Sequence, residues 1–165
     1  MILYLDTSSL IKLYVLETES AAVKRLVDAA EVVATSRIAY AEARAAFARK
    51  RRERGVSPAD YRTTTQDFDH DWENYFVVDV SDALVKLGGL LAERHALRGF
   101  DAIHLASAVT IRKQGDRPVS FSCFDARLIR AARREGLTPV SEPANSITVD
   151  GYITTPDQEA SDAHR

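Results

Sequence analysis

Cysteine is almost absent from this 165-residue chain, and long apolar runs are lacking. The single thiol, Cys123, cannot form a disulfide within the chain, which suits a reducing compartment. No stretch reaches the roughly 20 apolar residues that a membrane-spanning helix needs. The first apolar run begins at Ile2, which leaves no room for a basic segment and a cleavage site, so we expect no secretory signal. These features predict a cytoplasmic protein.

An excess of charge of one sign is also lacking. The chain has 22 Lys and Arg against 24 Asp and Glu, for a net charge of −2 at pH 7. Net charge therefore argues neither for nor against a nucleic-acid partner, and only a local group of cations could do so. Hydrophobic residues make up 45% of the chain, which is ordinary for a globular protein with one buried core.

Apolar runs rich in β-branched residues alternate with helical patterns. The predicted strands are 2–5, 32–35, 76–80, 119–124 and 137–140. The predicted helices are 9–16, 20–30, 37–54, 58–75, 82–95, 102–114 and 126–135. Because strands that alternate with helices need crossover connections, the pattern predicts an α/β fold with three α/β/α layers and a mostly parallel central sheet.

The predicted domain covers residues 1–141, because no internal repeat and no Gly/Ser-rich linker interrupts that range. From residue 142 the composition shifts to Pro, Ser, Thr and Asp. We expect residues 142–165 to form a C-terminal extension, with a hairpin that turns at Asp150 and Gly151 before a flexible tail.

Four acidic residues stand where an α/β sheet binds ligands. Asp6 and Asp125 directly follow predicted strands, and ligands collect beyond the carboxyl ends of parallel strands. Asp101 precedes a helix that is apolar nearly all round, and Glu42 lies among apolar and small residues of another helix. Capping of a helix is worth about 1 kcal/mol and could explain each Asp by itself. It does not explain Glu42, because burial of an unpaired acid is costly.

Convergence of these acids would have a chemical consequence. Two carboxylates about 5 Å apart repel by roughly 3 kcal/mol at an effective dielectric constant of about 20. A cluster of four therefore needs protons or cations. Oxygen ligands without Cys or His suit Mg²⁺ or Mn²⁺ rather than Zn²⁺. Because Mg²⁺ also binds substrate phosphate oxygens, such a cluster points to phosphoryl-transfer chemistry.

Four segments of the chain carry a resemblance to a known family. They are "YLDTSSLIKLY", "SRIAYAEARAAFAR", "FDAIHLASAV" and "FSCFDARLIRAARREGL". In order and approximate spacing they are similar to the signature segments of PIN-domain ribonucleases, especially the VapC-like toxins of toxin–antitoxin pairs. The resemblance spans residues 2 to 141, and each segment has its acid in place.

The resemblance implies a Mg²⁺- or Mn²⁺-dependent endoribonuclease, the toxin of a type II toxin–antitoxin system, with a PIN-like domain over residues 1–141. It further implies an RNA substrate, a cognate antitoxin and a homodimer. Its catalytic and metal-binding residues would be Asp6, Glu42, Asp101 and Asp125. Asp6 and Asp101 would be the firmest metal ligands, and Asp125 would bind directly or through water. Glu42 would orient or deprotonate the attacking water.

One position departs from the family pattern. Family members commonly carry Thr or Ser two residues before the last acid, where this chain has Cys123, preceded by Ser122. A thiol is a weak hydrogen-bonding partner for a carboxylate or a hydrated metal ion. The surroundings of Asp125 are therefore where we expect this chain to differ from the family.

Other residues near these acids have simpler interpretations. His104, three residues after Asp101, is expected to be a packed and hydrogen-bonded core residue rather than a ligand. Two runs rich in arginine, 44–54 and 127–134, are either solvated helix faces or contacts for RNA phosphates. The apolar residues 14–16 belong either to the core or to a groove for a partner helix.

Two alternative functions are compatible with parts of the pattern. One is a catalytically inactive PIN-like module that binds RNA or protein, although four intact acids speak against it. The other is a haloacid-dehalogenase-type phosphotransferase, which also places an Asp after its first strand. That chemistry normally needs a second Asp two residues later, and Ser8 stands there in this chain.

Overall fold

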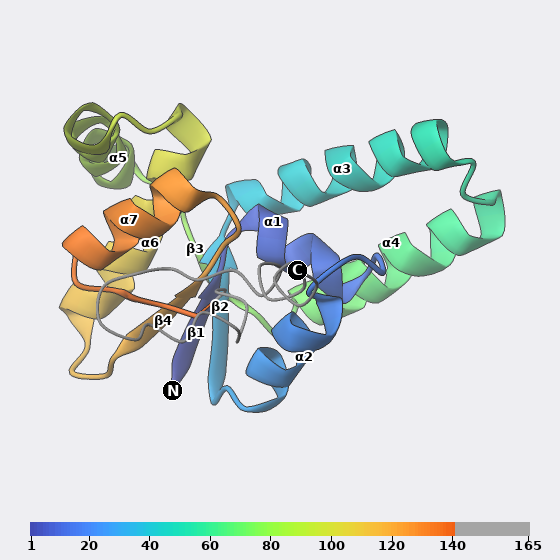
Figure 1. Cartoon of the computed structure of the whole chain (residues 1–165), viewed down its shortest axis with the longest axis horizontal. Helices are drawn as coiled ribbons and strands as arrows, with labels where there is room; N and C mark the ends of the chain where they lie inside the picture. Colours follow the sequence, from blue (N-terminus) through green and yellow to red (C-terminus); the bar gives the residue numbers. More distant parts are fainter. Residues whose placement is uncertain (141–165) are drawn as a thin grey trace, which may run out of the picture.

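Five parallel strands form one central sheet in the computed structural model, which describes residues 1–140 (Figure 1). The strands are β1 (Ile2–Leu5), β2 (Val32–Ser36), β3 (Phe76–Val78), β4 (Val119–Ser122) and β5 (Thr138–Pro139). They pair in the order β3-β2-β1-β4-β5, so β1 lies at the centre. In the register, Ile2 of β1 stands opposite Val32 of β2 on one side and Val119 of β4 on the other.

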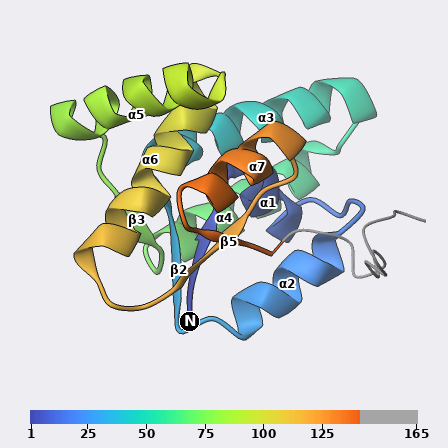
Figure 2. The same ribbon diagram turned by 60° about the vertical axis from the view of Figure 1, so that its left-hand side comes forward.

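Helices cover both faces of this sheet (Figure 2). Near the amino terminus they are α1 (Thr7–Leu10), the 3-10 helix η1 (Ile11–Leu13) and α2 (Ser20–Asp28). The remainder are α3 (Ile38–Arg54), α4 (Pro58–Trp72), α5 (Asp82–His95), α6 (Gly99–Gln114) and α7 (Ala126–Arg134). Within residues 1–140, no helix has the length and apolar character needed to cross a membrane.

The alternation of β1 side chains divides the core into two halves. Leu3 and Leu5 pack with residues of α2, α3 and α4, including Phe47 and Phe68. Tyr4 points to the opposite face and packs with residues of α5, α6 and α7. Because β1 is buried on both faces, its apolar run is continuous, as expected for a central parallel strand. The predicted three-layer α/β/α fold is confirmed, and the sheet is wholly parallel.

Helix α6 begins earlier than the sequence pattern predicts. Its N-cap is Arg98 and its first residue is Gly99, whereas the apolar run placed the start at Ala102. Asp101 therefore lies within the first helical turn and does not cap it. The pattern was ambiguous because an acid is favourable in the first turn as well as at the cap.

Three other predicted features differ from the structure or lie outside it. The first helix begins at Thr7, directly after Asp6, and is a short α-helix followed by η1. Strand β4 ends at Ser122, two residues before the predicted end. The predicted boundary after residue 141 and the predicted hairpin in 142–165 lie outside the described residues and stay predictions.

Close packing of α5 on α6 yields the first prediction. A Cβ atom at Gly88 would lie 2.8 Å from Ile103 Cδ1, whereas a Cβ atom at Gly89 would meet nothing within 4 Å. Replacing a glycine inside an exposed helix with alanine gains about 1 kcal/mol. We therefore expect Gly89→Ala to raise the free energy of unfolding in urea by about that amount. Gly88→Ala should gain less because Ile103 must move, and equal gains would contradict this packing.

Candidate active site

The carboxyl ends of β1 and β4 meet where the strand order changes direction. From β1 the chain first adds β2 and β3 on one side, and later adds β4 and β5 on the other. Such a switch point is where α/β sheets bind ligands. Asp6 follows β1, and its backbone N–H donates to Ser122 O at the end of β4, at 3.1 Å. Asp125 follows β4 within three residues, so both acids reach one edge of the sheet.

Asp6 is a buried carboxylate held by neutral donors. Its side chain is at the N-cap of α1 and accepts hydrogen bonds from Ser9 N–H at 2.9 Å and from the Ser8 hydroxyl at 2.7 Å. Only 6% of Asp6 is exposed. Burial raises the pKa of Asp6, although the nearby His104 and these hydrogen bonds act in the opposite direction. Asp6 is therefore positioned without being neutralised.

The serines after Asp6 attach α1 to the end of β4. Ser8 Oγ, which donates to Asp6, also accepts from Phe124 N–H at 3.2 Å. Ser122 Oγ donates to Ser9 Oγ at 2.9 Å inside the core. These bonds fix the position of Asp6 relative to the segment that carries Asp125. The hydroxyl run after Asp6 thus has a structural function that the resemblance alone did not assign.

Glu42 is part of a hydrogen-bonded network whose residues come from four elements, β1, α1, α3 and α6. Its Oε2 atom accepts from Thr7 Oγ1 at 2.5 Å and lies 2.9 Å from His104 Nε2. The other ring nitrogen, Nδ1, lies 2.9 Å from the hydroxyl of Tyr4. Both contacts are satisfied when Nε2–H donates to Glu42 and Nδ1 accepts from Tyr4. Burial opposes ionisation of Glu42, but the bonds from His104 and Thr7 prevail and lower its pKa.

Asp101 and Asp125 influence each other across the start of α6 and α7. Burial raises the pKa of Asp101, and the carboxylates of Asp125 and Glu42 raise it further. Asp125 is exposed and caps α7, with Oδ1 accepting from the backbone N–H groups of Arg127 and Leu128, each at 2.8 Å. The structure therefore brings the four predicted acids to one edge of the sheet.

Cys123 lies beneath these acids, fully buried. Burial raises the pKa of its thiol, and the carboxylates of Asp6, Asp125 and Asp101 add to the effect. Its sulfur is 4.0 Å from the backbone oxygen of Asp125. The thiol is thus a packed group, and Asp125 takes its hydrogen bonds from the backbone of α7 instead.

The donor set fits a hard divalent cation. Among residues 1–140, none of the four acids forms an ion pair with Lys or Arg, and all contribute oxygen. In the same part of the chain, no three acidic, His or Cys side chains are arranged as a ready-made metal site. Mg²⁺ needs only one or two carboxylates beside its waters, so a complete protein cage is not required. Asp125 uses Oδ1 to cap α7, so Oδ2 is the oxygen that it would offer to the ion.

Thr7, Tyr4 and His104 belong to this site although the sequence analysis gave them no role in it. His104 is confirmed as buried and hydrogen-bonded, being 3% exposed, but one of its partners is the candidate catalytic acid Glu42. The available signal was the position of His104 one helical turn after Asp101, which places both on one face of α6. Its partners come from β1 and α3 and could not be deduced from that spacing.

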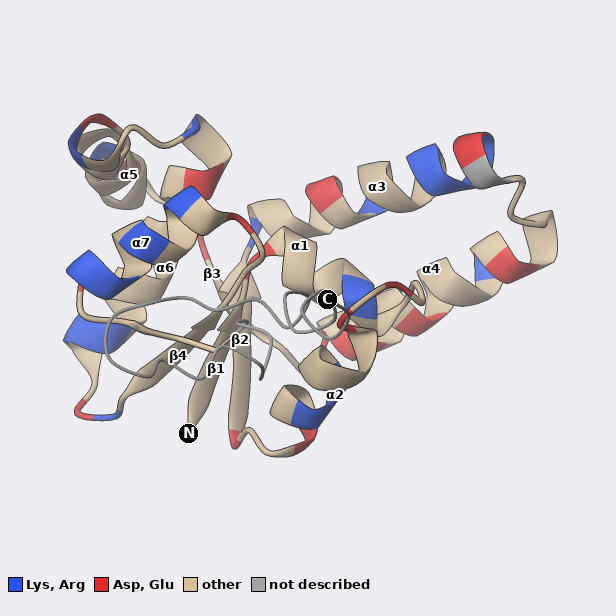
Figure 3. Cartoon of the chain, viewed as in Figure 1, with Lys and Arg blue, Asp and Glu red and all other residues tan. Residues whose placement is uncertain are grey.

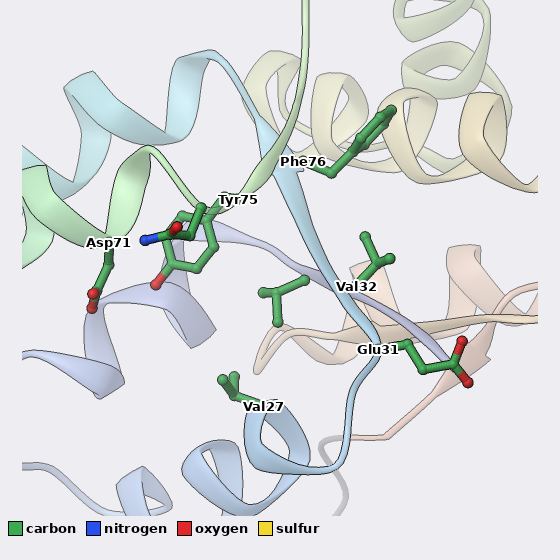
Figure 4. A pocket seen from close by; sticks show the side chains of 8 residues that line it. Val27, Glu31, Val32, Asp71, Tyr75 and Phe76 are labelled. Atoms are coloured by element: carbon green, nitrogen blue, oxygen red, sulfur yellow. The ribbon is translucent and has the colours of Figure 1, made fainter.

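A cavity of about 550 Å³ lies away from the four acids, where β2 and β3 begin (Figure 4). Val27, Val32 and Phe76 give it a largely apolar lining. Its carboxylates are engaged, since Glu31 pairs with the amino terminus and Arg117, and Asp71 accepts from the Tyr14 hydroxyl. This hollow lies at the amino ends of the strands, so the acidic edge remains the candidate active site.

The fold and the acidic edge define an α/β/α domain with a cluster of acids at its ligand-binding switch point. The sequence model of the PIN-domain family matches residues 3–134 of this chain, so the chain belongs to the PIN-domain family. It is 33% identical to Ribonuclease VapC45 of Mycobacterium tuberculosis over 135 residues, which cover 82% of this chain and 92% of that protein. Membership removes the basis for the haloacid-dehalogenase alternative.

Solved structures share the same fold. VapBC-1 from nontypeable Haemophilus influenzae superposes with a TM-score of 0.59 at 15% identity, covering 86% of this chain and 98% of that one. A toxin-antitoxin complex from Klebsiella pneumoniae gives a TM-score of 0.56 at 19% identity, with 76% and 88% covered. At these identities the likeness shows the fold alone.

The raised pKa of Asp6 predicts a stabilising substitution. A carboxyl group whose pKa rises on folding disfavours the folded state above that pKa, and the cost disappears as pH falls toward the ordinary aspartate value. Asn preserves the cap without the charge. In EDTA, Asp6→Asn should therefore have a higher free energy of unfolding than the parent at pH 7, and this advantage should shrink as the pH is lowered. A lower stability at pH 7 would contradict the unpaired state of Asp6.

Proposed function

We propose that this chain is a metal-dependent endoribonuclease that hydrolyses RNA phosphodiester bonds in the cytoplasm and acts as the toxin of a type II toxin–antitoxin pair. The observation that supports it most is the set of four acids without a Lys or Arg partner among residues 1–140, at the switch point of a PIN domain. The name of the M. tuberculosis relative gives ribonuclease as its activity.

Asp6 and Asp101 are the proposed ligands of Mg²⁺ or Mn²⁺, with Asp125 directly or through water. The bound ion would supply an acidified water and neutralise charge on the phosphate. Burial raises the pKa of both Asp6 and Asp101, and the carboxylates of Asp125 and Glu42 raise that of Asp101 further, which explains why these acids favour a cation. Hydrogen bonds from the Ser8 hydroxyl and the Ser9 backbone amide keep the Asp6 carboxylate in place.

Glu42 is the proposed group that orients or deprotonates the attacking water. Its lowered pKa keeps it ionised and able to accept a proton at neutral pH. Thr7 and His104 both contact Oε2, which leaves Oε1 without a described hydrogen bond and available for water. The two groups of acids thus have different environments, as expected when they have different roles.

The proposed protein partners are a cognate antitoxin and a second copy of the chain. The Klebsiella neighbour is a toxin-antitoxin complex, which supports the first proposal by analogy of fold. Leu16, after η1, is 91% exposed and would be a contact for the antitoxin. Light scattering of the purified chain, alone and with its antitoxin, measures both assemblies.

Loss of carboxylates should abolish cleavage without unfolding the protein. We expect Asp6→Asn, Asp101→Asn and Glu42→Gln each to slow cleavage of an unstructured RNA by about 100-fold or more. EDTA should stop the parent enzyme, and Mg²⁺ or Mn²⁺ should restore it. Gel analysis of an end-labelled oligoribonucleotide measures the rate, and a thermal melt verifies folding.

Asp116→Asn is the matched control because Asp116 is exposed and precedes β4, at the opposite edge of the sheet. It should cleave like the parent. If the Asn and Gln variants also cleave like the parent, the proposed catalytic residues are wrong. If the parent binds RNA without cleaving it in either metal, the alternative of an inactive binding module is correct.

A further inference from the structure

Three cations in the arginine-rich end of α3 are engaged by acidic or aromatic neighbours. Arg44 pairs with Asp69 at 3.0 Å, and Lys50 pairs with Glu17. The guanidinium of Arg51 lies over the ring of Tyr61 at 5.1 Å. This part of α3 also extends away from the sheet beside α4 (Figure 1). Of the two basic runs in the sequence, it is therefore the weaker candidate for contact with RNA at the acids.

A second group of arginines surrounds the acids themselves. Arg98 precedes α6, while Arg127 and Arg130 lie on α7, and all three are exposed. Among residues 1–140, no carboxylate forms an ion pair with any of them. Arg127 donates to Ala96 O at 3.2 Å and so joins α7 to the turn that carries Arg98. Figure 3 shows cationic and acidic segments side by side at the starts of α6 and α7.

Helix stability does not account for these positions. Cations are favourable at the carboxyl end of a helix, where Arg133 and Arg134 stand. Arg98 and Arg127 lie instead at the amino ends of α6 and α7, where the helix dipole disfavours positive charge. Arg98 does lower the pKa of Asp101, but less strongly than burial and Asp125 raise it. A negatively charged ligand bound there would offset the positive charge of Arg98 and Arg127.

An exposed aromatic ring stands in the first turn of α6, next to Asp101 in the sequence. Phe100 follows Arg98 and precedes Asp101, and it is 61% exposed. A solvated ring of this size beside guanidinium groups is the combination that binds single-stranded nucleic acid, with bases on the ring and phosphates on the cations. It is also sequence-tolerant, because every base has a face that can stack.

We propose that Phe100 stacks on the base of an RNA nucleotide next to the cleaved bond, while Arg98 and Arg127 hold the phosphates that flank it. This inference rests on the proposed ribonuclease function and deepens it by naming the residues that bind the single strand. Arg130, one turn after Arg127, continues the cationic track along α7. The group Arg98, Phe100, Arg127 and Arg130 is the RNA-binding rim.

The test uses the full chain carrying Asp6→Asn, with Mg²⁺ and a fluorescent single-stranded oligoribonucleotide. Fluorescence anisotropy should show that Phe100→Ala weakens binding between about 5-fold and about 150-fold, the range of one lost base stack. Phe100→Trp should restore binding, and Phe100→Leu, which keeps apolar bulk without a ring, should not. A 2-aminopurine base in the RNA should lose its quenching in the Ala and Leu variants.

Matched controls come from the opposite edge of the sheet. Phe76, at the start of β3, is 55% exposed. Phe76→Ala therefore removes a similarly exposed ring that is not part of the RNA-binding rim. Arg98→Ala and Arg127→Ala should each reduce the slope of log affinity against log salt by about 0.7. Arg25→Ala, near the end of α2, should leave that slope unchanged.

The outcomes separate the two proposals. If the unsubstituted chain neither binds nor cleaves single-stranded RNA, the proposed function fails. If it cleaves RNA but Phe100→Ala binds like Phe76→Ala, the function stands and the rim is refuted. If Phe100→Ala instead changes the molar mass in light scattering, Phe100 is a contact between subunits and the rim is again refuted.

Discussion

The unneutralised charge of Asp6 is the constraint on which the arrangement of this domain depends. A buried carboxylate would ordinarily be paired with a cation or protonated, because desolvation of its charge is costly. Here Ser8 and Ser9 of α1 supply neutral donors, a hydroxyl and a backbone amide, with Ser8 held in turn by the backbone of Phe124. The position of the charge is fixed while its electrostatic cost remains. That combination favours a divalent cation.

The acids at this edge of the sheet lie in different environments, and their pKa values are shifted in different directions. Asp6 has a raised pKa because burial disfavours its charge, and Asp101 has one because burial and the carboxylates of Asp125 and Glu42 disfavour its charge. Glu42 has a lowered pKa because Thr7 and His104 donate to it. His104 is in turn held by Tyr4, whose ring lies in the opposite half of the core from Leu3 and Leu5. The central strand thus connects the packing of the core to the orientation of the proposed catalytic acid.

The cations of this domain differ in whether a carboxylate already offsets their charge. Arg44 and Lys50 of α3 are paired with carboxylates, whereas Arg98 and Arg127, at the starts of α6 and α7, have no carboxylate partner among residues 1–140. Paired cations contribute little to the binding of a polyanion, because their charge is already offset. The net charge of −2 conceals this difference, which exists only in the folded chain.

The sequence by itself determined the fold class and singled out the four acids as candidates for one site. The alternation of apolar runs with helices fixes parallel crossovers, and the position of Asp6 and Asp125 after strands follows from strand ends alone. Tertiary structure decided the contacts between distant segments. The bonds of Glu42 to Thr7 and His104 join residues 35 and 62 positions apart, so no local periodicity encodes them. The start of α6 also escaped prediction, because an Asp in the first turn and an Asp at the cap leave the same local pattern.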